Sequence, residues 1–435
     1  MKIDKTEIFI IPVGDRYNKR VEEVNIIYSP LCNICCTMID NATTQHVVDV
    51  ITYNVAARNE KISEWVTKLL DYQIPDRKKM LRQSPEEYTT LSLLPNHACN
   101  FQCRYCYSAQ GRSQTMIDRK KLQQALDFFI NPVRLEPQKI KLFISGGGEP
   151  LLKWEDTLFA IVYAHERALQ YGFTLWTTII TNGSIINETI VDVLKKYKCG
   201  VCVSFEIFEE FQNNLRGHYT KVSKVLTEYG QSGIPVSLNS TITAISVSMM
   251  KDMVGKLCSD YSFVTDYTLE PVTDHTLFDS PAAMKIFYQQ FSKNYFNLKK
   301  EYSQTKIKLW CTLDEMMVTK KLRYCPGKLC LTPHATFSIC HCVSSEQEER
   351  YEKCVYGKIT DDGVVFDMEK FKQLININVL HREKCRDCFA KWNCGGECMT
   401  RQDQYPEEYM EEVCNFNRQW LITQLEERYG CFNEK

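Results

Sequence analysis

The stretch Cys99-Asn100-Phe101-Gln102-Cys103-Arg104-Tyr105-Cys106-Tyr107 contains three cysteines in a C-x3-C-x2-C arrangement. The chain has 21 cysteines in 435 residues, and random placement gives such a triplet roughly 0.05 times per chain. The spacing alone is therefore suggestive, and its surroundings decide how it is interpreted. The apolar run Leu91 to Leu94 predicts a strand, so the triplet lies on the loop that follows this strand.

A second predicted strand, Ile140 to Ile144, runs into the glycine-rich stretch Ser145-Gly146-Gly147-Gly148-Glu149-Pro150. Glycine lets the backbone approach a ligand closely and adopt turns that other residues avoid. The cysteine triplet after one strand and the glycine run after the next resemble the radical S-adenosylmethionine (SAM) enzymes. In that family three thiolates hold three irons of a four-iron cluster, and the fourth iron accepts SAM. The resemblance implies that Cys99, Cys103 and Cys106 hold this cluster.

The same resemblance implies which residues contact SAM. Gly147-Gly148-Glu149-Pro150 matches the family's GGEP element, and Asn182 lies in a T-N-G turn after the third predicted strand. Ser204-Phe205-Glu206 with Arg216 is similar to the family's S-x-D segment and downstream arginine, although Glu206 stands where aspartate is more usual. Tyr107 is expected near the adenine and Asn239 near the ribose. The implied SAM contacts are Tyr107, Gly147, Gly148, Glu149, Pro150, Asn182, Ser204, Glu206, Arg216 and Asn239.

Each motif also has a simpler structural explanation. The triplet could form a zinc loop, but a closed zinc site takes four ligands and this loop offers only His97 beside the cysteines. The glycine run could be an ordinary β-turn. Asn-Gly is common in turns, and arginines such as Arg216 commonly form ion pairs.

Composition and charge exclude some classes of partner. The net charge is −1 and the isoelectric point is about 6.7, which gives no electrostatic reason to expect nucleic acid or a membrane surface as partner. No apolar run approaches the ~20 residues of a membrane span, and the N-terminus lacks the apolar core of a signal peptide. We therefore expect a cytoplasmic protein whose cysteines mostly bind metal and do not form disulfides. Isolated cysteines such as Cys199, Cys202 and Cys258 are expected to be small buried hydrophobes.

Hydrophobic patterns divide the chain into three expected domains. Residues 1–87 predict a small α+β domain, residues 88–304 alternate between strands and helices, and residues 305–435 form a cysteine-rich extension. The strand–helix units of the middle region predict an α/β fold, a partial (β/α)6 TIM-like barrel of the radical SAM type. Functional groups in such sheets lie at the carboxyl ends of the strands. The predicted strands are Leu91–Leu94, Ile140–Ile144, Phe173–Ile180, Val201–Phe205, Pro235–Thr241 and Phe263–Leu269.

A second cysteine array lies near the C-terminus. Cys385-x2-Cys388-x5-Cys394-x3-Cys398, followed by Cys414, resembles the SPASM extension of radical SAM enzymes that mature peptides and proteins. Four cysteines at these spacings arise by chance about 0.002 times in a chain of this composition. By resemblance, Cys385, Cys388, Cys394 and Cys414 hold one auxiliary four-iron cluster. A four-cysteine zinc module is the alternative.

A further auxiliary cluster is implied with an incomplete ligand set. Cys325-x9-Ala335-x4-Cys340 resembles the other half of the SPASM signature, with Ala335 in place of the usual glycine. By resemblance, Cys325, Cys340 and Cys398 hold part of this cluster. Its fourth corner is open to substrate or is filled by one of the nearby thiols of Cys311, Cys330, Cys342 and Cys354. The expected cofactors are therefore three [4Fe-4S] clusters, one for SAM and two auxiliary, together with SAM.

The N-terminal domain has two features that bear on its role. Cys32, Cys35 and Cys36 lie beside the run Tyr28-Ser29-Pro30-Leu31, which predicts a buried strand and not another metal site. Many radical SAM peptide maturases carry a domain before the triplet that receives a leader peptide. By that resemblance, this domain is expected to bind a leader, with a leader strand pairing to a sheet edge.

Taken as a whole, the resemblance implies a radical SAM peptide maturase. Such an enzyme receives an electron from a flavodoxin or ferredoxin-type donor and cleaves SAM reductively to a 5′-deoxyadenosyl radical. The radical abstracts a hydrogen from a ribosomally made precursor peptide, which leads to a thioether or carbon–carbon cross-link. The alternatives are a formylglycine-forming, sulfatase-maturing enzyme and a non-catalytic zinc or iron–sulfur scaffold. Beyond the SAM cluster, the sequence identifies no catalytic side chain.

Overall fold

The computed structural model describes residues 1–318 and 320–429, and it divides into two compact units. Each unit is built from stretches that are far apart in the sequence. The first comprises Met1–Leu81, Thr312–Pro326 and Ile377–Lys435, and the second comprises Arg82–Cys311 and Gly327–Asn376. The functional division at residues 87 and 304 stays a prediction.

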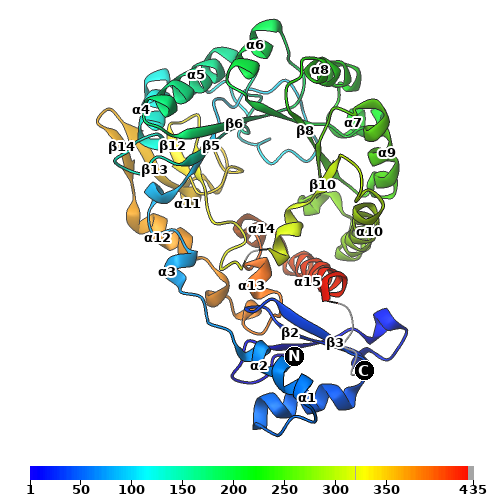
Figure 1. Ribbon diagram of the computed structural model, residues 1–435. Helices are drawn as coiled ribbons and strands as arrows, with labels where there is room; N and C mark the ends of the chain where they lie inside the picture. The colour runs from blue at the N-terminus through cyan, green and yellow to red at the C-terminus, as the bar shows by residue number, and fades with distance from the viewer. Residues whose placement is uncertain (319, 430–435) are drawn as a thin grey trace. The chain divides into compact units, whose positions relative to one another are not determined.

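A single mixed sheet forms the centre of the second unit (Figure 1). In spatial order the strands are β10 (Lys308–Trp310), β9 (Asp266–Pro271), β8 (Val236–Ile242), β7 (Gly200–Ser204), β6 (Thr174–Thr181), β5 (Lys139–Ile144), β4 (Thr90–Leu93), β11 (Leu329–Leu331), β12 (Thr336–Ser338), β13 (Val355–Thr360) and β14 (Gly363–Phe366). In this order, all neighbouring strands from β10 through β4 to β11 are parallel. β12, β13 and β14 continue the sheet in antiparallel pairs.

Helices cover the outer face of this curved sheet (Figure 1). In β5, Ile140 and Leu142 are buried while Lys139 and Lys141 are exposed, as expected when one face packs on helices and the other lines the inside of the curve. The α/β partial barrel predicted from the sequence is confirmed. The helices of this unit are α4 (Arg119–Phe129), α5 (Trp154–Gln170), α6 (Glu188–Lys196), α7 (Glu209–Leu215), α8 (Tyr219–Gln231), α9 (Met250–Asp260), α10 (Pro281–Glu301), α11 (Tyr351–Cys354) and α12 (Met368–Asn376).

The sheet extends past the predicted strands at both ends. β10 pairs with β9, and β11 pairs in parallel with β4, so that Cys330 lies opposite Ser92. Residues 327–376, which the prediction placed in the C-terminal extension, therefore belong to the same compact unit as the barrel. β10, β11 and β12 have three residues each, and segments this short show no hydrophobic alternation that could reveal them.

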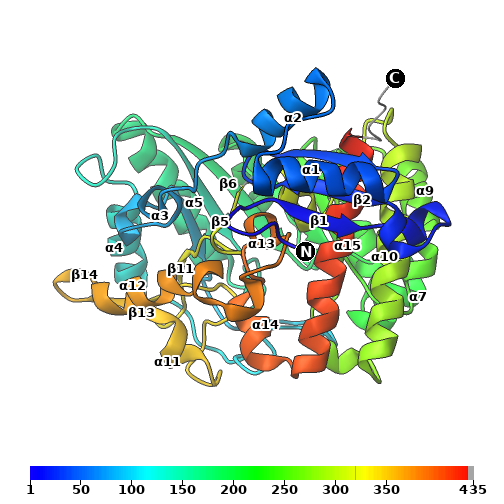
Figure 2. The same cartoon turned by 90° about the horizontal axis from the view of Figure 1, so that it is seen from below.

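An antiparallel three-stranded sheet organises the first unit, in the order β1 (Phe9–Pro12), β2 (Asn25–Ser29) and β3 (Ile34–Met38). α1 (Asn41–Tyr53) and α2 (Glu60–Leu70) lie on one side of it, and α13 (Lys391–Cys394) and α15 (Glu407–Tyr429) on the other (Figure 1). Figure 2 shows α1 lying across the strands. All residues of β2 are buried, as expected for a strand covered on both faces. The unit also contains α3 (Arg77–Met80) and α14 (Met399–Gln404).

The isolated and N-terminal cysteines differ in burial. Cys35 and Cys36 lie on β3 and are buried, which confirms the predicted buried strand. Cys199 is buried as expected, whereas Cys202 and Cys258 are half-buried. Within residues 1–318 and 320–429 no cysteine forms a disulfide. No helix in this described part of the chain is long and apolar enough to cross a membrane.

Candidate functional site

The loop after β4 carries Cys99, Cys103 and Cys106. A backbone hydrogen bond from the Ile117 N–H to the Pro95 carbonyl oxygen (3.0 Å) closes the base of this loop. All three cysteines are half-buried. The closed loop therefore presents its three thiols within a short span of chain.

These three thiols share one electrostatic environment. Burial raises the pKa of Cys103. The charge of Arg216 opposes this rise, whereas the charges of Cys106 and Cys99 add to it. Burial acts to lower the pKa of Arg112, but a hydrogen bond to Cys106 and the charges of all three thiols outweigh it and raise that pKa. The Arg112 guanidinium also donates to a backbone carbonyl oxygen of the same loop. The sequence analysis missed Arg112, since nothing in its spacing from the triplet marks it.

The donor set fits an iron–sulfur cluster. Arg216 and Arg112 oppose the rise in the pKa of Cys103, and the thiolate is the form of cysteine that binds iron. Within the described residues, no three His, Cys, Asp or Glu side chains are arranged to hold a single metal ion. The assignment of Cys99, Cys103 and Cys106 as cluster ligands stays a prediction.

The glycine-rich loop after β5 lies against the cysteine loop. Gly146 and Gly147 have φ angles of +57° and +70°, which residues with a side chain rarely adopt. A Cβ atom on Gly148 would lie 2.0 Å from the Ala98 carbonyl oxygen, so no larger residue fits there. The Glu149 N–H donates to that same oxygen at 2.7 Å. The two sequence motifs are therefore in direct contact.

The Glu149 side chain links the end of β5 to the end of β6. Its buried carboxylate accepts hydrogen bonds from Thr181 Oγ1 (2.7 Å), the Asn182 N–H (2.7 Å) and the Leu151 N–H (3.0 Å). Burial raises the pKa of this carboxyl, while the three donors favour its ionised form. The carboxylate is occupied by protein partners, so it positions the two loops.

Asn182, in the predicted T-N-G turn, reaches the cysteine loop. Its Nδ2 donates to Asn100 Oδ1 at 2.9 Å and lies 3.9 Å from Cys99 Sγ. The next residue, Gly183, has a φ angle of +71° and leaves no room for a Cβ, which would lie 2.7 Å from the Val203 side chain. The turn is thus shaped to bring Asn182 beside the first cysteine.

A buried polar network joins the cysteine loop to the end of β7. Tyr105, which lies between Cys103 and Cys106, donates a hydrogen bond from its hydroxyl to the Glu206 carboxylate. Arg216 Nη1 donates to the same hydroxyl at 3.1 Å and lies 3.9 Å from Glu206 Oε1. Burial raises the pKa of Glu206 to about 6, an effect that Arg216 and Tyr105 oppose. The sequence analysis missed Tyr105, although its place inside the triplet was a signal.

Several polar atoms at this end of the sheet are buried without a hydrogen-bond partner among the described residues, and three of them lie on or after β7 and β8. They are Glu206 Oε2, Arg216 Nε and Asn239 Oδ1. Unpaired buried polar atoms are rare in folded proteins and indicate a missing partner. Ser204 and Asn239 occupy paired positions on β7 and β8. The site therefore fits a ligand with amino, carboxylate and hydroxyl groups, as SAM has.

Tyr107 has different neighbours from those of Tyr105. Its ring meets the His341 ring edge-on, with centroids 5.8 Å apart. Its hydroxyl lies 3.3 Å from the position of a Cβ on Gly146. The expected contact of Tyr107 with adenine stays a prediction.

Four of the expected auxiliary ligands gather in the first unit. Burial, followed by the charges of Glu397, Cys414 and Cys388, raises the pKa of Cys394. Burial raises the pKa of Cys414 to about 12, and the charge of Cys385 contributes to this shift. Burial also raises the pKa of Cys385, and Cys388 adds to it. These electrostatic interactions link all four thiols to one another, as expected for the ligands of one cluster, and the ligand assignment stays a prediction.

The other implied auxiliary set is divided between the units. Cys325 and Cys398 belong to the first unit and Cys340 to the second. Cys398 Sγ lies 2.9 Å from Thr400 Oγ1. The assignment of these three cysteines, and of their fourth partner, stays a prediction.

Part of the chain matches a known protein family. Residues 93–253 match the family model described as the Radical SAM superfamily. This region contains both the cysteine loop and the glycine-rich loop. The resemblance to radical SAM enzymes predicted from the sequence is confirmed for this region.

Two curated relatives match a similar extent of the chain. The radical SAM cyclopropyl synthase TigE of Paramaledivibacter caminithermalis is 28% identical over 150 residues, which are 31% of this chain and 31% of TigE. The serine-type anaerobic sulfatase-maturating enzyme of Klebsiella aerogenes is 27% identical over 132 residues, 30% of this chain and 32% of that protein. The chain thus matches about a third of the length of these relatives.

Two solved structures share the fold over most of the chain. The structure of anSMEcpe with bound AdoMet has a TM-score of 0.61 at 16% identity, and the match covers 78% of this chain and 98% of that one. Streptococcus suis SuiB bound to the precursor peptide SuiA has a TM-score of 0.54 at 13% identity over 85% of each chain. At these identities the comparisons establish a shared fold.

Proposed function

We propose that this chain is a cytoplasmic radical SAM enzyme that modifies a ribosomally made precursor peptide and forms a thioether or carbon–carbon cross-link. The observation that carries the proposal is the contact between the cysteine loop and the glycine-rich loop, in which Gly148 packs on the Ala98 carbonyl. This contact lies inside the region that matches the superfamily. A peptide substrate is supported by the SuiB structure, which holds a precursor peptide.

In this proposal Cys99, Cys103 and Cys106 hold the SAM cluster. When bound and reduced by a flavodoxin or ferredoxin-type donor, the cluster and SAM supply the 5′-deoxyadenosyl radical that abstracts a hydrogen from the peptide. The residues of the chain position these groups. The Glu149 carboxylate fixes the glycine-rich loop against β6, and Arg216 offers a buried positive charge for the SAM carboxylate.

The auxiliary cysteines complete the proposed cofactor set, with Cys385, Cys388, Cys394 and Cys414 holding one further four-iron cluster. Oxidative coupling of two peptide positions leaves an electron to be removed, and a cluster near the substrate can accept it. Cys325, Cys340 and Cys398 are assigned to the remaining cluster on resemblance alone.

The three-stranded sheet of the first unit is the proposed leader site. Its β1 edge is occupied by the chain's own start, since the Ile10 N–H donates to the Met1 carbonyl oxygen (2.7 Å) and the Ile3 N–H donates to the Ile8 carbonyl oxygen (2.8 Å). β3 is the opposite edge strand of this sheet. A leader strand that pairs with the sheet would therefore add to β3.

Hydrogen exchange of the intact protein tests the leader site. Adding a precursor with its leader should protect the backbone amides of residues 34–38, whereas the same peptide without the leader should not. Equal exchange in both samples, with the modified product still formed, would refute leader binding at β3. Deleting residues 1–85 is the weaker test, because this segment shares a compact unit with residues 377–435.

Formylglycine formation is the second candidate function, because the chain is similar to the sulfatase-maturating enzyme of Klebsiella aerogenes. A product assay distinguishes it from peptide cross-linking. The reconstituted protein is incubated with SAM, a reductant and a candidate precursor peptide, and the product is examined by mass spectrometry. Cross-linking and the oxidation of serine to formylglycine each remove a pair of hydrogens, but only formylglycine carries an aldehyde that hydroxylamine converts to an oxime. A product that has lost the hydrogens and resists hydroxylamine supports the cross-link, and an oxime supports the alternative.

A further inference from the structure

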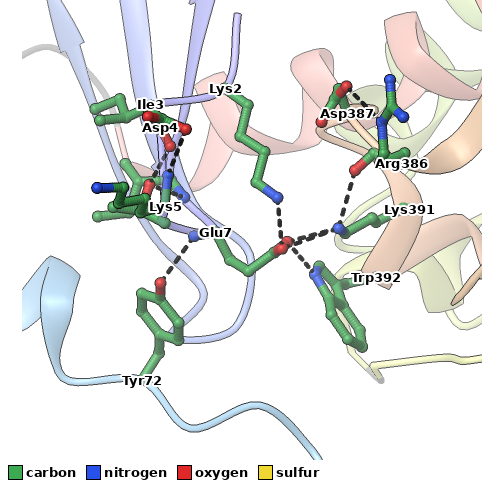
Figure 3. Close-up of polar contacts among 12 residues, drawn as sticks. Lys2, Ile3, Asp4, Lys5, Glu7, Tyr72, Arg386, Asp387, Lys391 and Trp392 are labelled. Carbon is green, nitrogen blue, oxygen red and sulfur yellow. Dashed lines mark hydrogen bonds and ion pairs between the residues drawn. The ribbon is translucent and has the colours of Figure 1, made fainter.

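A half-buried cluster of charged side chains centres on Glu7, just before β1 (Figure 3). One carboxylate oxygen lies 2.7 Å from Lys2 Nζ, and the other lies 2.8 Å from Lys391 Nζ. The same second oxygen accepts a hydrogen bond of 2.8 Å from Trp392 Nε1. Burial acts to raise the pKa of Glu7, but these three donors outweigh it and lower the pKa, so Glu7 is a carboxylate. The Glu7 N–H in turn donates to the Tyr72 hydroxyl at 2.8 Å.

Lys391 lies inside the cysteine-rich loop of the same unit. It is the first residue of α13, which ends at Cys394, and its N–H donates to the Cys388 carbonyl oxygen at 3.1 Å. Its Nζ also donates to the Arg386 carbonyl oxygen at 3.1 Å, and its side chain is only 7% exposed. A buried ammonium without a counter-ion is strongly destabilising, so the partner that neutralises it matters. That partner is Glu7.

The residue after Trp392 forms a second link to the N-terminal sheet. The buried Tyr28 hydroxyl on β2 donates to Asn393 Oδ1 at 2.9 Å, and Asn393 Nδ2 donates to the Met316 carbonyl oxygen at 2.8 Å. The N-terminal segment therefore contacts three consecutive residues: Glu7 binds Lys391 and Trp392, and Tyr28 binds Asn393. These three residues fill α13 up to Cys394. Through Glu7 and Tyr28, the N-terminal segment thus contacts the chain between Cys388 and Cys394, two of the expected ligands.

We propose that Glu7 is a positioning residue for the auxiliary cluster of Cys385, Cys388, Cys394 and Cys414, and that the Glu7–Lys391 pair sets the charge beside that cluster and hence its reduction potential. The inference rests on the proposed function, because it requires that these cysteines hold a cluster. Nearby charge tunes such potentials, since reduction adds an electron that a positive charge stabilises. Neutralising Glu7 leaves the Lys391 charge uncompensated, and neutralising Lys391 leaves the opposite excess.

The test is a potentiometric titration, followed by electron paramagnetic resonance, of the anaerobically reconstituted full chain. The background carries Cys99→Ala, Cys103→Ala and Cys106→Ala, so that auxiliary clusters alone contribute. Glu7→Gln should move the potential in the positive direction and Lys391→Met in the negative direction. Glu64→Gln, an exposed carboxylate change in the same unit, should leave the potential unchanged.

The double variant Glu7→Gln/Lys391→Met protects the test against a simple loss of folding. It removes both charges, so it should hold as much iron as the background and show nearly the background potential. Equal potentials in all variants, shifts of the same sign in both single variants, or a double variant that cannot hold iron would overturn the inference. Absence of iron from the background protein would instead refute the auxiliary cluster itself, which separates failure of the proposed function from failure of the role of Glu7.

Discussion

Replacing Tyr105 by phenylalanine removes a single hydroxyl, and that hydroxyl joins the cysteine loop to the end of β7. It donates to Glu206 and accepts from Arg216. A hydrogen bond to a charged group contributes about 1.5–3 kcal/mol, so loss of these two bonds should lower the free energy of unfolding by about 3–6 kcal/mol. The carboxylate of Glu206 would keep only the Thr241 N–H at 3.4 Å and the more distant guanidinium of Arg216 at 3.9 Å.

The Tyr105→Phe variant should still bind iron, because the three cysteines are unchanged. Its SAM cleavage should fall by about tenfold or more, since 1.4 kcal/mol of lost positioning corresponds to a factor of ten. Urea denaturation, iron content and 5′-deoxyadenosine formation measure these effects. Tyr163→Phe is the matched control: its hydroxyl also bonds a carboxylate, Asp127 at 2.7 Å, but near the surface, where the loss should be about 1 kcal/mol or less. Equal stability and equal SAM cleavage in the two variants would refute the role of this network.

The remaining predictions concern other parts of the site. Gly148→Ala places a Cβ 2.0 Å from a carbonyl oxygen and should abolish SAM binding measured by equilibrium dialysis, whereas Gly255→Ala, in an open helical position, should bind as before. Burial raises the pKa of Glu206 from its usual 4.5 to about 6, so the folded state holds this proton more tightly than the unfolded state does. The bound proton therefore adds about 2 kcal/mol to the free energy of unfolding below pH 4.5, and this contribution is lost as the pH rises through about 6. Glu206→Gln should remove this pH dependence from the free energy of unfolding measured by denaturation at several pH values, and an unchanged pH dependence would contradict the assignment. Cys388→Ala/Cys394→Ala should remove about four irons and stop product formation while some SAM cleavage continues, and full product formation would show this cluster to be dispensable.

The barrel could be predicted because most of its strands are apolar runs long enough to be recognised from the hydrophobic pattern of the sequence. β4 to β9 each coincide with such a run, and each is followed by a segment of helical periodicity. β10, β11 and β12 were missed because three residues carry no period. Residues 327–376 join the sheet through long-range pairing, such as that of β11 with β4, and local patterns contain no information about it.

The site shows the same division between local and long-range signals. The cysteine and glycine motifs depend on spacing within a few residues, so they could be found in the sequence. The bond between Tyr105 and Glu206 joins residues 101 positions apart, and that between Lys391 and Glu7 joins residues 384 positions apart. Only the folded chain brings these pairs together. Glu149 was expected to contact SAM, and that contact stays a prediction; its bonds to Thr181 and Asn182 indicate a positioning role that the motif alone does not reveal.

Reductive cleavage of SAM is the measurement that tests the account most directly. Anaerobically reconstituted protein, given SAM and dithionite, should form 5′-deoxyadenosine and methionine. The variant with Cys99, Cys103 and Cys106 replaced by alanine should form neither and should hold about four fewer irons. Cleavage that persists in this variant, or wild-type protein that holds zinc and leaves SAM intact, would contradict the assignment of the cysteine loop as the SAM cluster site.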